Sequence, residues 1–412
     1  MGRYKLLKGL LPFCLVFFAV SALADDEPEE EVEVSLSGSA SVELRLFPDD
    51  PPDPRQDYVG ELSFALEPEW YWSWGDGHHS FLLKPFLRMD NRDGERTHAD
   101  IREAIWTAWG DLGEVKVGIG KVFWGVAESL HLVDIVNQTD LVENIDQEDK
   151  LGQPMVRLSH PTDEWGTFDF YLLPGFRERT FPGKKGRLRS RPAVDVQNAE
   201  YESAAEQLHV DFALRWAYTY DIFDIGLAYF QGTGRDPLLL PGIDNVGNLH
   251  LVPYYEQIEQ LSIDAQATLD AWLLKFEAYT RKGKLGRHFA MVGGFEYTFV
   301  GVAETDIDVG VLAEYLFNDR KRLFEVDPAF QNDFFVGSRI VLNDVQSTEV
   351  LIGVISDLDS NVRFWNIEAS RRLGGAWKLS LEARAIAGKD KNDALQALRT
   401  EDYIQLELAR YF

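Results

Sequence analysis

A strict two-residue alternation near the start of the chain constrains the fold more than any other feature. Between residues 31 and 46 every even position is apolar or small, and every odd position is serine, glutamate or arginine. Successive side chains of a β-strand point to opposite faces, so this pattern predicts a strand whose two faces meet different solvents. The same alternation recurs at 208–218, 272–281 and 377–385.

The one long apolar run, residues 9–23, follows three basic residues and ends in Ala-Leu-Ala. A basic start, an apolar core and a small-residue cleavage site predict a secretory signal peptide over 1–24, cleaved near Ala24. An acidic segment, residues 25–30, follows it. The only cysteine, Cys14, lies in the signal, so we expect no disulfide and no cysteine metal site in the mature chain.

Without the predicted signal the chain has 38 basic and 68 acidic residues, a net charge of −30. Such acidity argues against nucleic acid as a partner. An exported chain of this length without a disulfide must be held together in another way. An ordinary water-soluble core would suffice, and so would a transmembrane barrel closed by its own hydrogen bonds.

Strand length, aromatic placement and connection length favour the barrel. The expected strands span 31–47, 58–73, 80–90, 99–110, 113–124, 153–160, 166–175, 206–220, 222–232, 257–270, 271–282, 288–300, 305–317, 333–343, 347–357, 362–373, 376–388 and 402–412. Aromatic residues gather at their ends, as in the interfacial girdles of outer-membrane proteins. Long connections alternate with short turns. We therefore predict that residues 31–412 form an all-β, transmembrane antiparallel β-barrel of about 18 strands, or 16 if two weak hairpins merge. It would lie in the outer membrane with long extracellular loops and short periplasmic turns.

The chain ends on Tyr411-Phe412 after an alternating segment. This end resembles the terminal strand of Gram-negative outer-membrane proteins, which implies that Phe412 is the assembly signal read by the barrel-assembly machinery. Arg410 departs from the pattern, and its long side chain can reach the membrane rim.

A local resemblance covers about 40 residues. It is carried by Asp100-Ile101-Arg102-Glu103-Ala104, by Val117-Gly118-Ile119-Gly120-Lys121-Val122-Phe123-Trp124-Gly125, and by Asp134-Ile135-Val136-Asn137 with Asp140. These segments resemble a porin-like Gram-negative outer-membrane family of unknown function, with departures at Val122 and Gln138. The resemblance implies an outer-membrane porin or exporter and a periplasmic transport partner.

The long connection at 125–152, here called the acidic loop, carries seven acidic residues and one lysine. Trimeric porins fold the loop at this place into the lumen, where carboxylates would concentrate cations. The predicted constriction residues are Glu128, Asp134, Asn137, Asp140 and Glu143. The alternative is a solvated surface loop that binds divalent ions or lipopolysaccharide.

Basic residues form two further candidate groups. Arg102, Lys116 and Arg157 lie on strands flanking the acidic loop and are predicted to form a basic lumen wall. The basic loop, residues 177–191, contains Arg177, Arg179, Lys184, Lys185, Arg187, Arg189 and Arg191. This loop could attract anions, bind lipopolysaccharide phosphates, pair with the acidic loop, or be a flexible surface segment.

These patterns predict a passive, weakly cation-preferring channel for small solutes. The alternatives are a closed structural or surface-binding barrel, and a conduit for hydrophobic substrate that works with a periplasmic carrier. The conduit would place Leu238–Leu240 at a lumen opening. Hydrolase, zinc-protease and nucleotide-binding motifs are missing from the sequence, so we expect no enzyme activity, catalytic residue, metal or cofactor. Outer-membrane lipid and lipopolysaccharide are expected partners, and a homotrimer and a monomer are both physically allowed.

Overall fold

The structure is a computed structural model, and it describes residues 32–51, 53–244, 247–320, 330–388, 395 and 398–412. The predicted signal peptide, residues 1–24, and the acidic segment, residues 25–30, lie outside the described residues.

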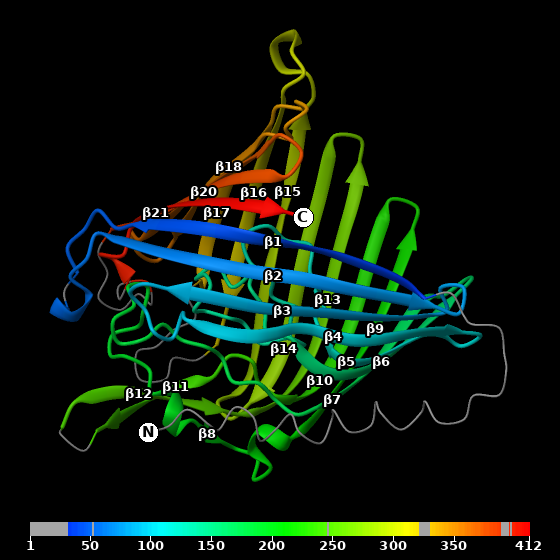
Figure 1. Ribbon diagram of the computed structural model, residues 1–412, viewed down its shortest axis with the longest axis horizontal. Helices are drawn as coiled ribbons and strands as arrows, with labels where there is room; N and C mark the ends of the chain where they lie inside the picture. The colour runs from blue at the N-terminus through cyan, green and yellow to red at the C-terminus, as the bar shows by residue number, and fades with distance from the viewer. Residues whose placement is uncertain (1–31, 52, 245–246, 321–329, 389–394, 396–397) are drawn as a thin grey trace.

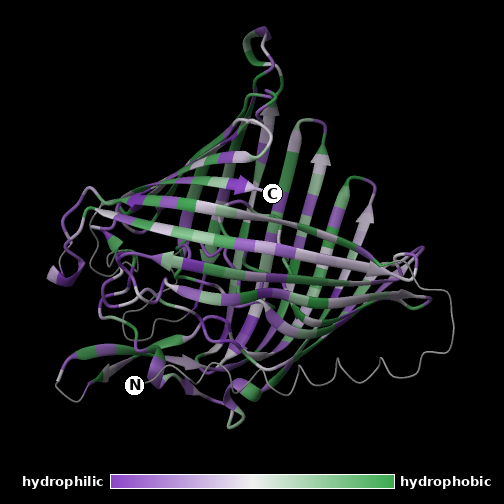
Figure 2. Ribbon diagram, in the orientation of Figure 1, coloured by the Kyte–Doolittle hydropathy of each residue, from purple (hydrophilic) through white to green (hydrophobic). Residues whose placement is uncertain are grey.

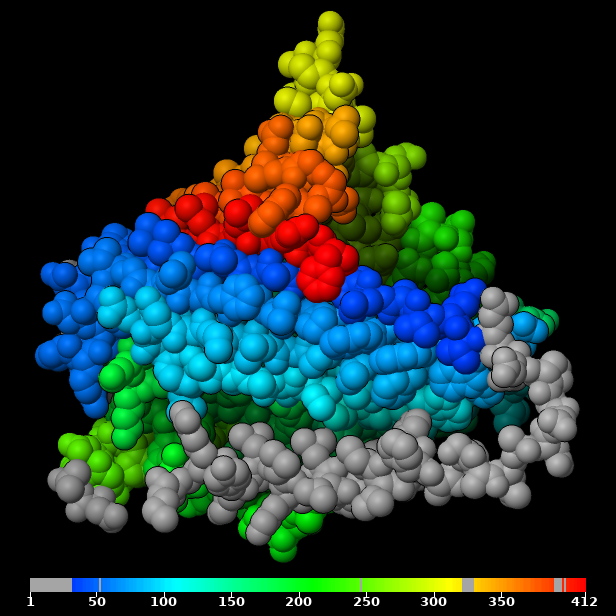
Figure 3. Space-filling view, in the orientation of Figure 1, coloured from blue at the N-terminus to red at the C-terminus, as the bar shows by residue number. Residues whose placement is uncertain are grey.

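Eighteen of the described strands form one closed antiparallel sheet (Figure 1). They are β1 (Glu33–Leu46), β2 (Gly60–Trp74), β3 (His79–Asp90), β4 (His98–Gly110), β5 (Gly113–Gly120), β6 (Gln153–Thr162), β7 (Gly166–Pro174), β9 (Val210–Tyr220), β10 (Phe223–Thr233), β13 (Gln257–Leu269), β14 (Trp272–Gly283), β15 (Gly286–Phe299), β16 (Asp308–Asn318), β17 (Asn332–Val341), β18 (Glu349–Asp357), β19 (Arg363–Leu373), β20 (Trp377–Ala387) and β21 (Tyr403–Tyr411). Each strand pairs with the next, and β21 pairs with β1 to close the ring. Figure 3 shows β21, in red, lying against β1, in blue. The predicted 18-stranded all-β barrel is confirmed.

Two of the predicted loops contain short strands. β8 (Glu200–Tyr201), β11 (Leu238–Ile243) and β12 (Leu249–Tyr255) form a separate three-stranded sheet at one end of the barrel (Figure 1). The four described helices are single 3-10 turns: η1 (Pro54–Gln56), η2 (Val196–Asn198), η3 (Glu206–Leu208) and η4 (Val302–Glu304). None of these described helices is long and apolar enough to cross a membrane.

The barrel reverses the usual distribution of polarity between surface and interior. On β1, Val42 and Leu44 point outward and are 49 % and 37 % exposed, whereas Glu43 and Arg45 point inward and are each 3 % exposed. Figure 2 shows the resulting alternation of apolar and polar residues along the strands. A surface of this kind suits an apolar solvent outside and a polar, cross-linked lumen inside.

The two ends of the barrel differ. The connections that follow β1, β5, β7 and β10 are long, and they meet at one end, here called the loop end. At the opposite end, the turn end, two-residue connections follow β4, β9 and β13. Exposed aromatic side chains gather at the turn end: Trp109, Trp165, Tyr220, Phe223, Trp272, Phe299, Trp377 and Tyr411.

The last residue takes part in closing the barrel. The amide of Phe412 donates to the carbonyl of Gly38 at 3.1 Å, and the amide of Gly38 donates to the carbonyl of Phe412 at 3.0 Å. A Cβ atom at residue 38 would lie 2.6 Å from the carbonyl oxygen of Glu67, so β1 and β2 approach closely enough there to require glycine.

Candidate functional site in the barrel lumen

The acidic loop folds into the barrel and is held first by two buried wall glutamates. The amides of residues 126–127 donate to Glu277 on β14 at 2.6 and 2.8 Å. The amides of residues 128–129 each donate to Glu314 on β16 at 2.8 Å. Both glutamates are at most 2 % exposed. Backbone amides satisfy these buried carboxylates, so the first half of the loop is fixed against this wall.

The second half of the loop is held by the opposite wall. Arg102 on β4 donates to Asp140 at 2.6 Å, and Arg88 on β3 pairs with Glu143 at 2.7 Å. Asp140 and Glu143 are 0 % and 5 % exposed. Because β4 and β16 lie nine strands apart around the ring of eighteen, the acidic loop spans the whole lumen.

A third attachment reaches β20, near the point where the ring closes. Asn144 donates to Glu382 at 2.9 Å, and Arg384 donates to Asp146 at 3.0 Å. Burial and the neighbouring Glu382 raise the pKa of Asp146 to about 6, although Arg384 opposes the shift. The loop is therefore fixed at three places on the wall.

Asn137 joins the chain just after β5 to the last part of the acidic loop. Its side-chain oxygen accepts from the amide of Val122, and its nitrogen donates to the carbonyls of Gly120 and Leu151, each at 2.9 Å. The sequence predicts that the fifth strand continues to residue 124, but β5 ends at Gly120. The reason is that Asn137 takes over the backbone groups that a neighbouring strand would otherwise pair.

Asp134 pairs with a lysine of the acidic loop itself, whereas Glu128 pairs with two cations of the barrel wall. Asp134 has a fully buried side chain that pairs with Lys150 at 3.3 Å, and burial raises its pKa. Glu128 lies between Arg339 on β17, at 2.7 Å, and Lys275 on β14, at 3.3 Å.

His131 adds a positive charge to the acidic loop. Burial alone would lower its pKa, but hydrogen bonding to Glu148 and Glu277 outweighs this and raises the pKa to about 10. Its Nε2 atom lies 3.0 Å from Glu148. The loop is therefore less negative at neutral pH than its acidic residues alone indicate.

Most of the basic loop is paired with carboxylates near the loop end. Arg177 pairs with Asp100, Arg179 with Asp236, Arg187 and Arg191 with Glu401, and Arg189 with Asp53. Lys184 and Lys185 are exposed. The contact with the acidic loop is polar rather than ionic: Thr180 donates to Asp140 at 2.6 Å, and Arg179 donates to Gln138 at 3.3 Å.

The three residues of the predicted basic wall are separated. Arg102 is 3 % exposed and contacts the acidic loop. Lys116 and Arg157 are register partners on β5 and β6 and pair with wall carboxylates, Lys116 with Glu114 at 3.3 Å and Arg157 with Asp169 at 2.9 Å. Neither has a described ion pair with the acidic loop.

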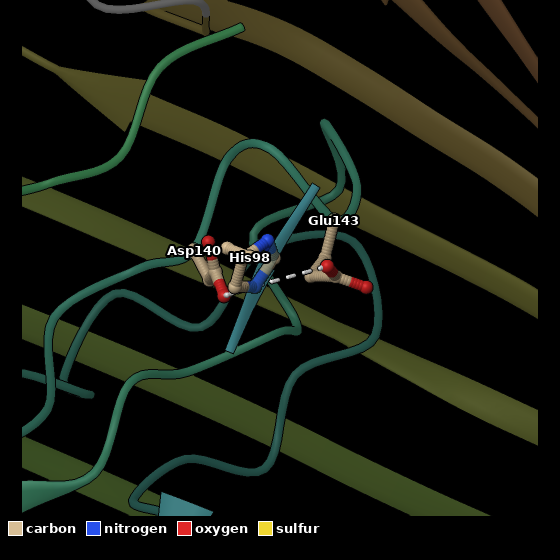
Figure 4. A group of neighbouring side chains, drawn as sticks. All are labelled: His98, Asp140 and Glu143. Atoms are coloured by element: carbon tan, nitrogen blue, oxygen red, sulfur yellow. Dashed lines mark ion pairs between the residues drawn. The ribbon is translucent and has the colours of Figure 1, made fainter. Parts of the chain in front are cut away.

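His98, Asp140 and Glu143 come together at the β4 attachment (Figure 4). The Nε2 atom of His98 lies 3.4 Å from Glu143 and 3.9 Å from Asp140. Both carboxylates already pair with arginines, Arg102 and Arg88, within 2.7 Å. A divalent cation would have to compete with these two guanidinium groups, so we interpret the group as part of the charge network that attaches the loop.

Three cavities lined by described residues bear on a passage through the lumen. The loop-side cavity, about 650 Å³, lies between the acidic loop and the inner faces of β17–β20. The turn-side cavity, about 310 Å³, lies against the same wall nearer the turn end. Both are lined by Glu128, Asp146, Leu351 and Glu368. The rear cavity, about 310 Å³, lies behind the loop and is lined by Asp134 and Asn137 among others. Asp140 and Glu143 line none of these three cavities.

Part of this wall is not among the site residues predicted from the sequence. Apolar side chains point into the lumen from β16–β19: Leu312, Leu316, Phe335, Leu351, Ile355 and Phe364. A signal was present, because Phe334-Phe335-Val336 is apolar on both faces of its strand, unlike the alternating segments elsewhere.

The comparisons with known proteins identify the fold. No protein-family model and no curated protein matches the chain. Among solved structures, a BenF-like porin from Pseudomonas fluorescens Pf-5 has a TM-score of 0.53 at 11 % identity, covering 93 % of this chain and 98 % of that one. OccK8 (OprE) of Pseudomonas aeruginosa has a TM-score of 0.51 at 10 % identity, covering 93 % and 98 %, and OccK11 (OpdR) of the same organism has a TM-score of 0.51 at 10 % identity, covering 92 % and 96 %.

This chain has the fold of these porins. At such identities the likeness concerns the fold alone. The local resemblance at residues 100–140 to a family of unknown function stays a prediction, since no family model matches.

Proposed function

We propose that the protein is an outer-membrane channel for passive diffusion of small solutes, with a weak preference for cations. The apolar exterior and the exposed aromatic residues at the turn end support a membrane location. In this proposal the turn end faces the periplasm and the loop end faces outward. Lipid would then cover the barrel wall, and exposed Lys184 and Lys185 would be free to meet lipopolysaccharide phosphates.

One observation carries the proposal. The loop-side and turn-side cavities lie one after the other along the same wall and share Glu128, Asp146 and Glu368. We infer that together they form the passage and that the shared residues form its narrowest part. The acidic loop narrows the lumen from one side, and β17–β20 bound the passage on the other.

The charge along this passage favours cations. Six carboxylates line the turn-side cavity, against Arg339 and Lys378. The carboxylates are Glu128, Asp146, Glu349, Glu368, Glu382 and Glu407. Low-dielectric walls focus the field of such charges and raise the local cation concentration. The preference for cations stays weak because Arg339 pairs with Glu128 and Arg384 pairs with Asp146.

The experiment is single-channel conductance of the refolded mature chain in a planar bilayer under a potassium chloride gradient. We expect stable openings and a reversal potential that indicates cation preference. Glu128→Gln leaves Arg339 and Lys275 without their shared carboxylate, so the preference should fall or reverse. Asp163→Asn, in the exposed turn after β6, is the matched control and should change nothing. Silence at every voltage would refute the open channel.

A second candidate rests on a separate observation. Leu238 and Leu239 line the rear cavity, and Leu239 also lines the loop-side cavity. An apolar side to the lumen favours a conduit for hydrophobic substrate, working with a periplasmic carrier. The conduit predicts no ionic current from the intact chain, whereas the channel predicts one. A closed structural barrel would likewise be silent, until the acidic loop is deleted.

A further inference from the structure

The lumen contains an apolar patch that a passage for ions alone does not require. Barrel lumens are ordinarily polar, because their inner faces contact water. Here Leu312 and Leu316 on β16 belong to one buried apolar cluster with Ala127 of the acidic loop, and Leu130 and Leu132 of that loop pack against the cluster. Phe335, Leu351, Ile355 and Phe364, which belong to this cluster or pack against it, also line the loop-side cavity. An apolar surface therefore forms one side of the proposed passage.

Two glycines shape this surface. Gly337 and Gly353 are register partners on β17 and β18, and the ring of Phe335 lies over both. A Cβ atom at residue 353 would lie 2.3 Å from the ring, and one at residue 337 would lie 2.8 Å from it. Any side chain at these positions would displace the ring. The glycines thus let Phe335 lie against the wall and leave the adjacent space open.

The exposed charges around the cavity are negative. The side chains of Glu368 and Glu148 are 45 % and 53 % exposed. The cationic side chains are more buried and already paired. Arg384 is 5 % exposed and contacts Asp146 and Glu368, and Arg179 is 12 % exposed and contacts Asp236. His131, which also lines the cavity, is 19 % exposed and pairs with Glu148.

An unsatisfied acceptor lies on the same wall. The Oδ1 atom of Asn366 is buried and has no hydrogen-bond partner among the described residues. Asn366 lies two residues before Glu368 on β19, so both side chains share the inner face, and both line the cavity. A buried amide oxygen without a donor gains free energy when a ligand supplies an N–H group.

We propose that the loop-side cavity binds small organic cations that have an apolar body, such as an aromatic ring, and one ammonium group. The apolar body would lie against Phe335, Leu351 and Phe364, while the ammonium group would contact Glu368 and donate to Asn366. A volume of about 650 Å³ lies within the range of small-molecule sites. This inference rests on the proposed channel and names its substrate class. Inorganic cations lack the apolar body, and aromatic anions would meet the exposed carboxylates.

The test compares three probes on the refolded mature chain: benzylammonium, methylammonium and benzenesulfonate. Each is titrated for block of the potassium current in planar bilayers and, independently, for binding by calorimetry in detergent micelles. Benzylammonium should block and bind at a concentration at least about tenfold below that of the other two, since only it combines ring burial with a positive charge. Equal affinities for the three probes would overturn the site.

Two variants locate the site. Glu368→Gln should weaken benzylammonium binding about fivefold, which is the upper range for a partly exposed ion pair. Glu349→Gln is the matched control, because Glu349 lines the turn-side cavity but not the loop-side cavity. Phe364→Ala should weaken binding to a similar extent while the barrel stays folded, as judged by heat-modifiable migration in gels. Equal effects of Glu368→Gln and Glu349→Gln would overturn the assignment.

The two assays separate this inference from the channel itself. A potassium current without selective block would support the channel and refute the binding site. Selective binding in micelles without any current would refute the open channel and support the site.

Discussion

The guanidinium of Arg102 on β4 lies 2.6 Å from the carboxylate of Asp140, and this pair attaches the acidic loop to the wall opposite β16. Both residues are almost fully buried. Removal of one partner from a buried pair leaves an uncompensated charge, whereas removal of both is far milder. Substitutions in this pair therefore show how much it contributes to holding the acidic loop against the wall.

Asp140→Asn should destabilise the docked loop by about 3 kcal/mol. The expected result is a noisier current with frequent transitions to larger conductance, because the loop leaves its position more often. The double variant Arg102→Met with Asp140→Asn should recover part of the loss. If the current through the Asp140→Asn variant is no noisier than the current through the unaltered protein, the pair does not hold the loop.

Among the side-chain amides of the acidic loop, Asn137 should be the one whose substitution destabilises the docked loop most. Asn137→Ala would leave the amide of Val122 and the carbonyls of Gly120 and Leu151 unpaired in a buried place, at a cost of about 1–3 kcal/mol for each group without a new partner. We expect trypsin to cleave the variant at Lys121 or Lys150 under conditions in which the unaltered protein resists. Asn248→Ala, in the exposed turn of the β11–β12 hairpin, is the control and should not change cleavage within the acidic loop.

The barrel itself could be predicted closely from the sequence. The strand expected over 166–175 is observed as Gly166–Pro174, and that expected over 257–270 as Gln257–Leu269. Such agreement arises because each strand contacts lipid-like surroundings on one side and a polar lumen on the other. The sequence of each strand therefore alternates between apolar and polar residues. The β8, β11 and β12 strands were not predicted, since the sheet they form has no such two-solvent pattern.

The partners inside the lumen could not be predicted in the same way. The sequence identifies Asp140 and Glu143 as acidic, but their arginines lie on β4 and β3, about 40 to 55 residues earlier. The glutamates that hold the loop backbone, Glu277 and Glu314, look like any inward carboxylate. Long-range ion pairing depends on where a loop crosses the barrel, and local periodicity does not contain that information.

The ion selectivity should depend on pH through Asp146. Its pKa is raised to about 6, so the group binds a proton more tightly in the folded chain, and its contribution to stability decreases as the pH rises through 6. Ionisation adds negative charge beside the narrowest part of the proposed passage. Cation preference, read from the reversal potential, should therefore increase between pH 5 and about pH 7.5.

Asp149, three residues farther along the acidic loop, should ionise in the same pH window. Burial, together with Glu143 and Asp146, raises its pKa to about 7. In the variant that combines Asp146→Asn with Asp149→Asn, the cation preference should consequently not change with pH. In Asp163→Asn, it should still increase with pH as in the unaltered protein. A slope that persists in the double variant would assign the pH dependence to other groups.

The position of the Phe335 ring depends on the absence of a side chain at residue 353. Gly353→Ala places a methyl group 2.3 Å from the present position of the ring, so the ring must move toward the loop-side cavity. Overpacking of this kind costs about 1–3 kcal/mol of stability, and it should also reduce the single-channel conductance because the ring enters the proposed passage. The matched variant that combines Phe335→Ala with Gly353→Ala removes the obstructing ring and should restore or exceed the original conductance. A conductance that is lowered equally in both variants would mean that residue 353 acts through the wall strands and not through Phe335. A conductance that is unchanged in Gly353→Ala would place the passage away from this wall.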